Sequence, residues 1–195
     1  MSFNLDHFWN TERDQHMDAA QKTFELLKPQ FEKLLNACVT SIQNGGKILF
    51  FGNGGSAADA QHLATELSIR YAKDRKPIAG LALTTDTSAI TAAGNDMGFE
   101  KIFARQIDAL GKKGDVAIGI STSGTSANII AGLKAAKTAG LITAGLSGRK
   151  GGDMVSNCDI LLIVPSETTA RIQEMHITLG QMLCGALEQK LGLIQ

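Results

Sequence analysis

The sequence predicts an α/β fold in which helices cover both faces of a parallel sheet. Five short apolar runs alternate with helical patterns, and the turns between them are short. Strands and helices that alternate in this way form parallel sheets with helices on both sides. At 195 residues and 44% hydrophobic content, the chain can bury one sizeable core, so we expect one folded unit. The expected strands are residues 47–51, 78–83, 115–120, 141–146 and 159–164.

The N-terminal part is expected to be helical. From about Asp14 to Asn44, apolar residues recur at three- and four-residue steps, which is the period of a helix. Pro29 interrupts this pattern and predicts two helices or one bent helix. We expect residues 1–45 to form a helical segment that packs in an oligomer, with ordinary covering of the core as the alternative. Residues 46–195 would then form the domain that carries the chemistry.

A glycine-rich loop, Gly52–Ser56, follows the first expected strand. Its glycines allow a sharp turn and a close approach to a ligand. Ser56 is expected to cap the next helix, with Asp59 completing a capping-box-like pair. Backbone N–H groups at such a helix start attract phosphate, although an ordinary turn is the alternative. Because Asp59, His62 and Glu66 share one helix face, the site also offers a base or a pair of metal ligands.

A second loop, Ser121–Ser126, lies between the third expected strand and a helix. Its hydroxyl groups can join backbone N–H groups and the helix dipole in holding an anion. It lacks the Gly-Lys-Ser/Thr of a Walker loop, so a nucleoside triphosphate is not expected. A solvated serine-rich linker is the alternative. The strong strand and helix patterns on either side favour the anion site.

A third polar segment, Gly94-Asn95-Asp96, is expected to be a loop after a short helix capped by residues 85–88. A plain Asx turn is the alternative. Ligands of parallel sheets bind beyond the carboxyl ends of the strands. We therefore expect this loop and the two loops above to face one crevice. The chain then ends with helical patterns at residues 99–110, from 127 to about 137, and 168–191.

The composition argues against several classes of protein. Lys+Arg and Asp+Glu both total 19, which indicates neither a nucleic-acid nor a membrane surface. Only 5% of the residues are aromatic, and no apolar run approaches the ~20 residues of a membrane span. The three cysteines are far apart and fit reduced thiols in a cytoplasmic protein. The N-terminus has no apolar signal-peptide region, so we expect a cytoplasmic location.

Several motifs together resemble the phosphoheptose isomerases of the sugar-isomerase (SIS) fold. They are GNGGSAADAQH…E, AGND, ISTSGTSAN, SGRKGG and ARIQEMH, in this order from about Gly46 to the C-terminus. The resemblance implies a flavodoxin-like three-layer α/β/α sandwich with a five-stranded parallel sheet, and a homotetramer with sites at subunit interfaces. It also implies conversion of D-sedoheptulose 7-phosphate to D-glycero-D-manno-heptose 7-phosphate through an enediol. This aldose feeds heptose synthesis for lipopolysaccharide.

The resemblance also implies roles for individual residues. Glu66 would be the base that moves a proton between C1 and C2, helped by a raised pKa in a partly buried site, with a surface glutamate as the alternative. Gln173 would contact the substrate. Some family members bind zinc through the positions of His62, Glu66 and Gln173 and through a histidine at position 181. The substrate ligands would be Asn53, Gly54, Gly55, Asn95 and Asp96 for the sugar, and Ser121, Thr122, Ser123 and Ser126 for the phosphate.

Position 181 is where the sequence departs from the family pattern. The pattern RIQE-x-H-x4-H places a second histidine there, and this chain has Gln181. His176 lies about 140° round the helix and is a poor substitute. In the family this histidine is a zinc ligand and the proposed acid–base partner of the glutamate, so the resemblance implies that Gln181 stands at a catalytic position. Glutamine does not exchange a proton near neutral pH, and loss of an acid–base group typically costs ~10²–10⁴-fold in rate.

Several interpretations stay open at this stage. One is an isomerase that uses water or another subunit's residue, and another is a substitution that traps substrate. A third is a non-catalytic SIS protein like the one that binds the replication initiator DnaA, and a fourth is a sugar-phosphate-binding regulatory module. Retention of Glu66 favours the enzyme.

Overall fold

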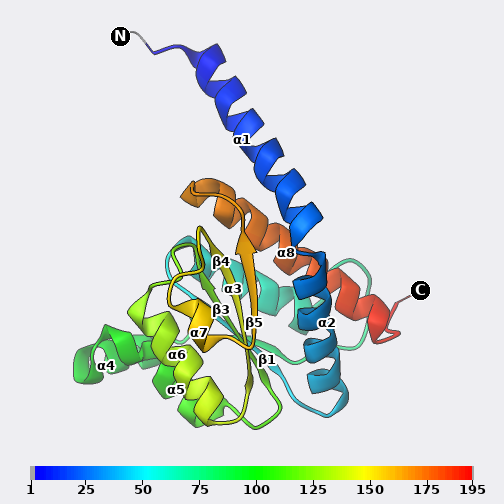
Figure 1. Cartoon of the computed structure of the whole chain (residues 1–195). Helices are drawn as coiled ribbons and strands as arrows, with labels where there is room; N and C mark the ends of the chain where they lie inside the picture. Colours follow the sequence, from blue (N-terminus) through cyan, green and yellow to red (C-terminus); the bar gives the residue numbers. More distant parts are fainter. Residues whose placement is uncertain (1–2, 195) are drawn as a thin grey trace.

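The computed structural model describes residues 3–194, which form a parallel five-stranded sheet between two layers of helices (Figure 1). The strand order is β2-β1-β3-β4-β5, and every neighbouring pair is parallel. This is the flavodoxin-like order, so the predicted fold is confirmed. The strands are β1 Ile48–Gly52, β2 Gly80–Ala82, β3 Val116–Ser121, β4 Ile142–Gly148 and β5 Ile160–Val164.

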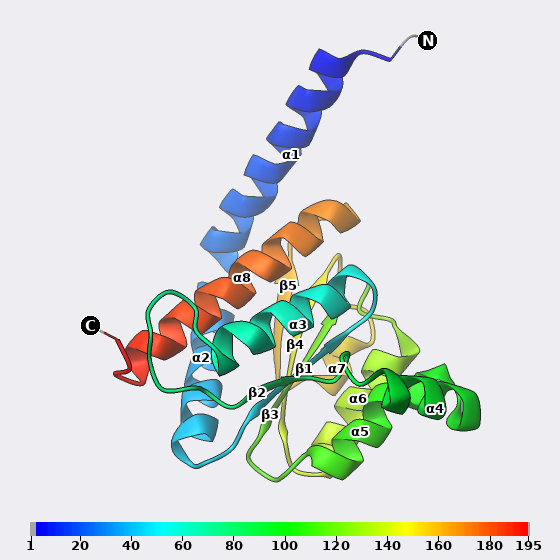
Figure 2. The ribbon, with the colours of Figure 1, turned by 180° about the vertical axis from the view of Figure 1, so that it is seen from behind.

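The two helical layers bury opposite faces of the sheet. Helices α2, α3 and α8 cover one face, while α4, α5, α6 and α7 cover the other (Figures 1 and 2). Every residue of β1 and β3 is buried, which is why these strands read as continuous apolar runs. The helices are α1 Leu5–Leu26, α2 Lys28–Gln43, α3 Gly55–Ser68, α4 Thr87–Met97, α5 Ile102–Leu110, α6 Ala127–Thr138, α7 Met154–Asn157 and α8 Thr169–Lys190, with a 3-10 turn η1 at Phe99–Lys101.

The C-terminal part of helix α1 packs against α8, and its N-terminal part extends well beyond the sheet (Figures 1 and 2). Its C-terminal half is held by buried Ala19 and Thr23. Nearer the middle of α1, Arg171 of α8 donates to the Glu12 carbonyl oxygen at 2.7 Å. The N-terminal half carries exposed apolar side chains, among them Trp9, which is 69% exposed. Within residues 3–194, no helix is both long and apolar enough to cross a bilayer.

The N-terminal helices differ in detail from the prediction. Helix α1 begins at Leu5, far before Asp14, because the Asn4 side chain accepts a hydrogen bond from the His7 N–H and caps it. The chain forms two helices, and Leu27 separates them. Pro29 lies in the first turn of α2, where its missing N–H leaves no hydrogen bond unmade. Helix α2 contributes side chains to the same core as the sheet. The division into an N-terminal helical segment, residues 1–45, and a domain that carries the chemistry stays a prediction.

The predicted loop at Gly94-Asn95-Asp96 is wrong. These residues lie in α4, which begins when the Asp86 carboxylate accepts a hydrogen bond from the Ala89 N–H at 2.9 Å. The helix continues through Gly94 to Met97 and ends at Gly98, where φ is +93°. One glycine within a helix costs only about 1 kcal/mol, which is too little to end it.

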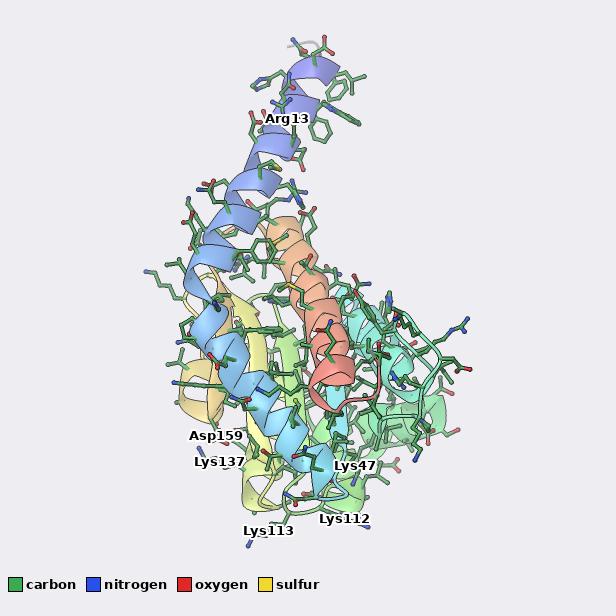
Figure 3. The ribbon with its side chains drawn as sticks, turned by 90° about the vertical axis from the view of Figure 1, so that its right-hand side faces the viewer. Arg13, Lys47, Lys112, Lys113, Lys137 and Asp159 are labelled. Atoms are coloured by element: carbon green, nitrogen blue, oxygen red, sulfur yellow. The ribbon has the colours of Figure 1, made fainter. Side chains whose placement is uncertain are left out.

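A buried carboxylate binds the backbone at the edge of the sheet where the strands begin. Asp115 accepts hydrogen bonds from the backbone N–H groups of Lys47 and Lys112, both at 2.9 Å, and pairs with the Lys47 ammonium. Figure 3 shows Lys47, Lys112 and Lys113 together at this edge, far from Arg13 on α1. The loops expected to bind substrate lie at the opposite edge, after the carboxyl ends of the strands.

Candidate functional site

The glycine loop and the serine loop follow adjacent strands at the point where the strand order reverses. The first follows β1 and the second follows β3, which are hydrogen-bonded neighbours. In sheets of this order, that switch point is where ligands bind. Two hydrogen bonds join the loops: Asn53 and the buried Asn128 donate to each other's amide oxygens at 2.9 and 2.7 Å. Asn128 closes the ISTSGTSAN motif and was not among the predicted ligands.

The start of α3 has a different cap from the one predicted. Gly54, with φ at +55°, precedes the helix, and no side chain accepts a hydrogen bond from its first turn. The prediction that Ser56 is the cap is therefore wrong, because the helix begins at Gly55 and Ser56 is buried inside it. The N–H groups of Ser56 and Ala57 instead donate to the carbonyl oxygens of Asn53 and Gly54, both at 3.0 Å, so the backbone of the loop closes the first turn.

Gly55 lets a side chain from α8 reach this loop. A Cβ atom at Gly55 would lie only 2.0 Å from Nε2 of Gln173, so no larger residue fits without moving Gln173. The amide of Gln173 thus lies against the loop that holds Asn53 and Gly54. Gln173, a predicted substrate ligand, therefore lies beside two other predicted ligands, Asn53 and Gly54.

The serine loop gathers its hydroxyl groups at the start of α6. The Ser121 hydroxyl lies 3.2 Å from that of Ser126 and 3.5 Å from that of Ser123. The Gly124 N–H donates to the Ser121 oxygen at 3.1 Å, and Thr122 is half-buried in the same loop. Ser126 precedes α6 without capping it through its side chain. Three hydroxyl groups at the positive end of a helix suit a phosphate.

Asp59, His62 and Glu66 lie on one face of α3, as predicted. Nε2 of His62 lies 2.8 Å from Oε1 of Glu66, and the Glu66 side chain is only 18% exposed. Asp59, one turn earlier, is largely buried. Burial raises the pKa of Asp59 to about 6, and the nearby His62 partly opposes this rise. The face therefore combines a carboxylate–imidazole pair with a carboxyl group that is easily protonated.

Helix α8 packs along α3 at Gly180, directly before position 181. A Cβ atom at Gly180 would lie 2.5 Å from the side chain of Leu63, and the half-buried Gln181 follows directly. His176 points elsewhere: its ring Nε2 lies 3.0 Å from the Ser147 carbonyl oxygen of β4. Burial lowers the pKa of His176 to about 4, so the ring is neutral at pH 7 and Nε2–H donates to Ser147. The prediction that His176 does not replace a histidine at position 181 agrees with this geometry.

The donors near Glu66 do not fit a zinc site. Protein zinc sites use three or four ligands from His, Cys, Asp and Glu. No group of three such residues that could hold a metal occurs in the described part of the chain. His62 and Glu66 supply two, and these are bonded to each other, while Gln173 and Gln181 offer only amide oxygens.

Asn95 and Asp96 stand apart from the two loops. Both are exposed at the end of α4, and the Asn95 amide donates to the Asp96 carboxylate at 2.7 Å. Asp96 lines a cavity of about 620 Å³ between α4 and α5. Between residues 3 and 194, no hydrogen bond links either residue to the glycine or serine loop. A single chain thus assembles the other predicted ligands without these two.

This fold and site define a sugar-isomerase class of protein. Residues 13–148 match the SIS domain family, and the chain belongs to it. A phosphoheptose isomerase from Paramagnetospirillum magneticum is 56% identical over 174 residues, which is 89% of this chain and 91% of the relative. A phosphoheptose isomerase from Helicobacter hepaticus is 50% identical over 182 residues, covering 93% and 92%. The chain therefore belongs to the phosphoheptose isomerase family.

Solved structures agree with this assignment. A phosphoheptose isomerase from Neisseria gonorrhoeae matches with a TM-score of 0.90 and 42% identity, covering 95% of this chain and 100% of that one. The enzyme from Francisella tularensis also gives a TM-score of 0.90, at 35% identity, covering 96% of this chain and 100% of that one. The agreement extends over α1 and α8 as well as the sheet, since nearly the whole chain is covered.

Proposed function

We propose that this protein interconverts D-sedoheptulose 7-phosphate and D-glycero-D-manno-heptose 7-phosphate. The observation that carries the proposal is the position of Glu66, a mostly buried carboxylate on the helix that starts at the switch point. The serine loop across this switch point suits a phosphate, and membership of the phosphoheptose isomerase family supports the substrate. The reaction would supply an aldose for heptose and lipopolysaccharide precursor synthesis in the cytoplasm.

The serine loop would hold the phosphate, which leaves the far end of the sugar to extend toward α3. The hydroxyl groups of Ser121, Ser123 and Ser126 and the start of α6 supply the donors. Asn53 and Gln173 would orient the sugar hydroxyls, because both lie at the glycine loop. Binding at both ends places C1 and C2 of the substrate beside Glu66.

Glu66 would carry the proton between the two carbons. Its carboxylate removes a proton from C1 of the ketose, which gives an enediol, and returns the proton to C2 of the aldose. His62 would orient Glu66 through their 2.8 Å hydrogen bond. The proton that moves from O1 to O2 needs a second carrier. Gln181 serves only as a hydrogen-bond partner for these oxygens, so water is the carrier that we propose.

The non-catalytic interpretations are not favoured. A DnaA-binding relative or a regulatory sugar-phosphate module would have no need of a Glu66 that is held by His62. The relatives with 50–56% identity are named phosphoheptose isomerases. Zinc binding through His62, Glu66, Gln173 and Gln181 stays a prediction, and Gln181 offers only an amide oxygen where the family pattern has a histidine.

We also propose a homotetramer with sites at the subunit interfaces. The face of α1 that packs on α8 continues past the end of α8 as Leu5, Phe8 and Trp9, which are 60%, 50% and 69% exposed. A second copy of the chain would bury this stripe. Asn95 and Asp96, which a single chain leaves apart from the loops, would then be supplied across an interface.

The test is turnover of sedoheptulose 7-phosphate by the purified protein, with zinc added and with zinc chelated. Glu66→Gln is expected to lower turnover by ~10²–10⁴-fold without lowering the melting temperature. Glu32→Gln, which alters an exposed carboxylate on α2, is the matched control and should behave as wild type. Absence of turnover by the wild type, or full turnover by Glu66→Gln, would contradict the proposal.

A further inference from the structure

A fully buried ion pair lies outside the site described above. Arg75, in the segment that follows α3, places Nε 2.8 Å from Oε1 of Glu188 near the end of α8. Both side chains are 0% exposed. Removing two charges from water is costly, and their attraction offsets this only when further hydrogen bonds satisfy both groups. The remaining contacts of the pair therefore show what it holds in place.

The other N–H groups of Arg75 bind the end of α3. Nη2 donates to the backbone oxygen of Glu66 at 2.6 Å, and Nη1 donates to that of Leu67 at 2.7 Å. The last carbonyls of a helix have no partner within the helix. Arg75 supplies a partner to the Glu66 carbonyl and a second one to the Leu67 carbonyl, which also accepts from the Ile78 N–H at 3.0 Å, so a side chain from outside α3 helps to complete its last turn. One of the two residues it holds is Glu66, the base in the proposed reaction.

Glu188 ties the same segment to α8. Its Oε1 also accepts a hydrogen bond from the Tyr71 N–H at 3.0 Å. The Tyr71 ring packs over Gly185, where a Cβ atom would lie 3.0 Å from the ring. Helix α8 carries Gln173, which lies against Gly55 at the start of α3, and Gln181, which directly follows the point where Gly180 packs on Leu63 of α3. The pair thus joins the last turn of α3 to the helix that brings these two glutamines to the site.

The pair is poorly arranged for stability alone. In the described structure, Oε2 of Glu188 is buried without a hydrogen-bond partner. Replacing such a pair by apolar side chains is often neutral or stabilising. Apolar side chains would not, however, hold the carbonyl oxygens of Glu66 and Leu67. What Arg75 adds beyond stability is the fixed position of the turn that carries Glu66.

We propose that Arg75 and Glu188 are positioning residues for Glu66. They lock the last turn of α3 against α8, so that the carboxylate and the glutamines of α8 keep one mutual geometry. A displacement of about 1 Å at a catalytic group can cost ~10²-fold in rate. This inference rests on the proposed role of Glu66 as the base.

The first experiment compares Arg75→Met with Lys47→Met. Both remove the cation of an ion pair with a buried carboxylate, but Asp115 binds the N–H groups of Lys47 and Lys112, before β1 and β3, and Lys47 holds no carbonyl oxygen of α3. Arg75→Met is expected to lower kcat by ~10–100-fold with little change in KM, because the substrate ligands stay in place. Lys47→Met is expected to lower the melting temperature and leave kcat unchanged. Equal kcat values in the two variants would overturn the proposal.

Two further variants keep the test decisive. If Arg75→Met does not fold, the double variant Arg75→Met/Glu188→Leu removes both charges and is expected to fold with the same loss of kcat. Arg75→Lys restores the charge but lacks the planar fork, so it should recover stability and little of kcat. Full recovery of kcat by lysine would show that charge alone matters and would overturn the proposal.

A cycle with Glu66→Gln separates this inference from the proposed function. If Arg75 acts through Glu66, Arg75→Met should lower kcat when Glu66 is present and should have no further effect on kcat in the Glu66→Gln variant. Faster amide hydrogen exchange in the last turn of α3, relative to Lys47→Met, should accompany the loss. Absence of turnover in the wild type refutes both proposals. Normal turnover by Arg75→Met refutes only this one.

Discussion

Buried His176 should make the protein lose stability in mild acid. The ring lies at the centre of the contact between α8 and β4, is 0% exposed, and donates through Nε2 to the Ser147 carbonyl oxygen. Nδ1 has no partner in the described structure. Adding a proton at Nδ1 would create a buried charge without a counter-ion. The folded state therefore resists protonation, and the unfolded state does not.

The magnitude follows from the two pKa values. Burial lowers the pKa of His176 from 6.5 to about 4 in the folded protein. Because the unfolded chain binds the proton first, stability is complete above pH 6.5 and declines as the pH falls toward 4. The full shift corresponds to about 3 kcal/mol, and about 2 kcal/mol of this is lost between pH 7 and pH 4.5.

The assay is urea unfolding at pH 7 and at pH 4.5 for the wild type and for His176→Gln. Glutamine keeps an N–H donor of similar reach but does not titrate. The other acid-sensitive groups are common to both proteins, including Asp159, whose pKa is held below its ordinary value because Thr143 and Lys137 favour the carboxylate over the opposing effect of burial. The wild type should lose about 2 kcal/mol more than the variant over this interval. Equal losses would refute the argument from burial.

The remaining predictions concern the site and the oligomer. Gln181→His should raise turnover and tighten zinc binding measured by calorimetry, with the exposed Gln189→His as the control; no gain in either would show that the site has repacked around glutamine. Asn128→Ala removes both hydrogen bonds to Asn53 and should raise KM more than it lowers kcat, so an unchanged KM would contradict the coupling of the two loops. Trp9→Ser should lower the mass of the oligomer that light scattering measures. If the variant keeps the mass of a tetramer, the exposed apolar stripe of α1 (Leu5, Phe8 and Trp9) is not part of the interface.

Much of the fold could be predicted from the sequence because the strongest signals are local. Continuous apolar runs mark β1 and β3, since both faces of these strands are buried. Three- and four-residue apolar steps mark α2 and α8. The glycine and serine loops were found because strand patterns end directly before them and helix patterns begin directly after them.

The errors lie where two local signals compete. Ser56 is a good cap by residue type, but Gly54 takes this position because its positive φ lets the helix begin two residues earlier. Gly94 reads as a helix end, yet α4 continues past it until Gly98, whose φ of +93° a helix does not contain. In both cases, packing against the rest of the chain decides between neighbouring residues of similar propensity.

The sequence by itself determined the element types, the parallel sheet, the family and the departure at Gln181. Only the tertiary structure decided which distant residues meet. Asn53 and Asn128 are 75 positions apart, and Arg75 and Glu188 are 113 positions apart. Only the fold shows that His176 turns to β4 and is buried there. The reason is physical: periodicity reports how a segment faces the core, whereas a partner across the core depends on how all the layers pack.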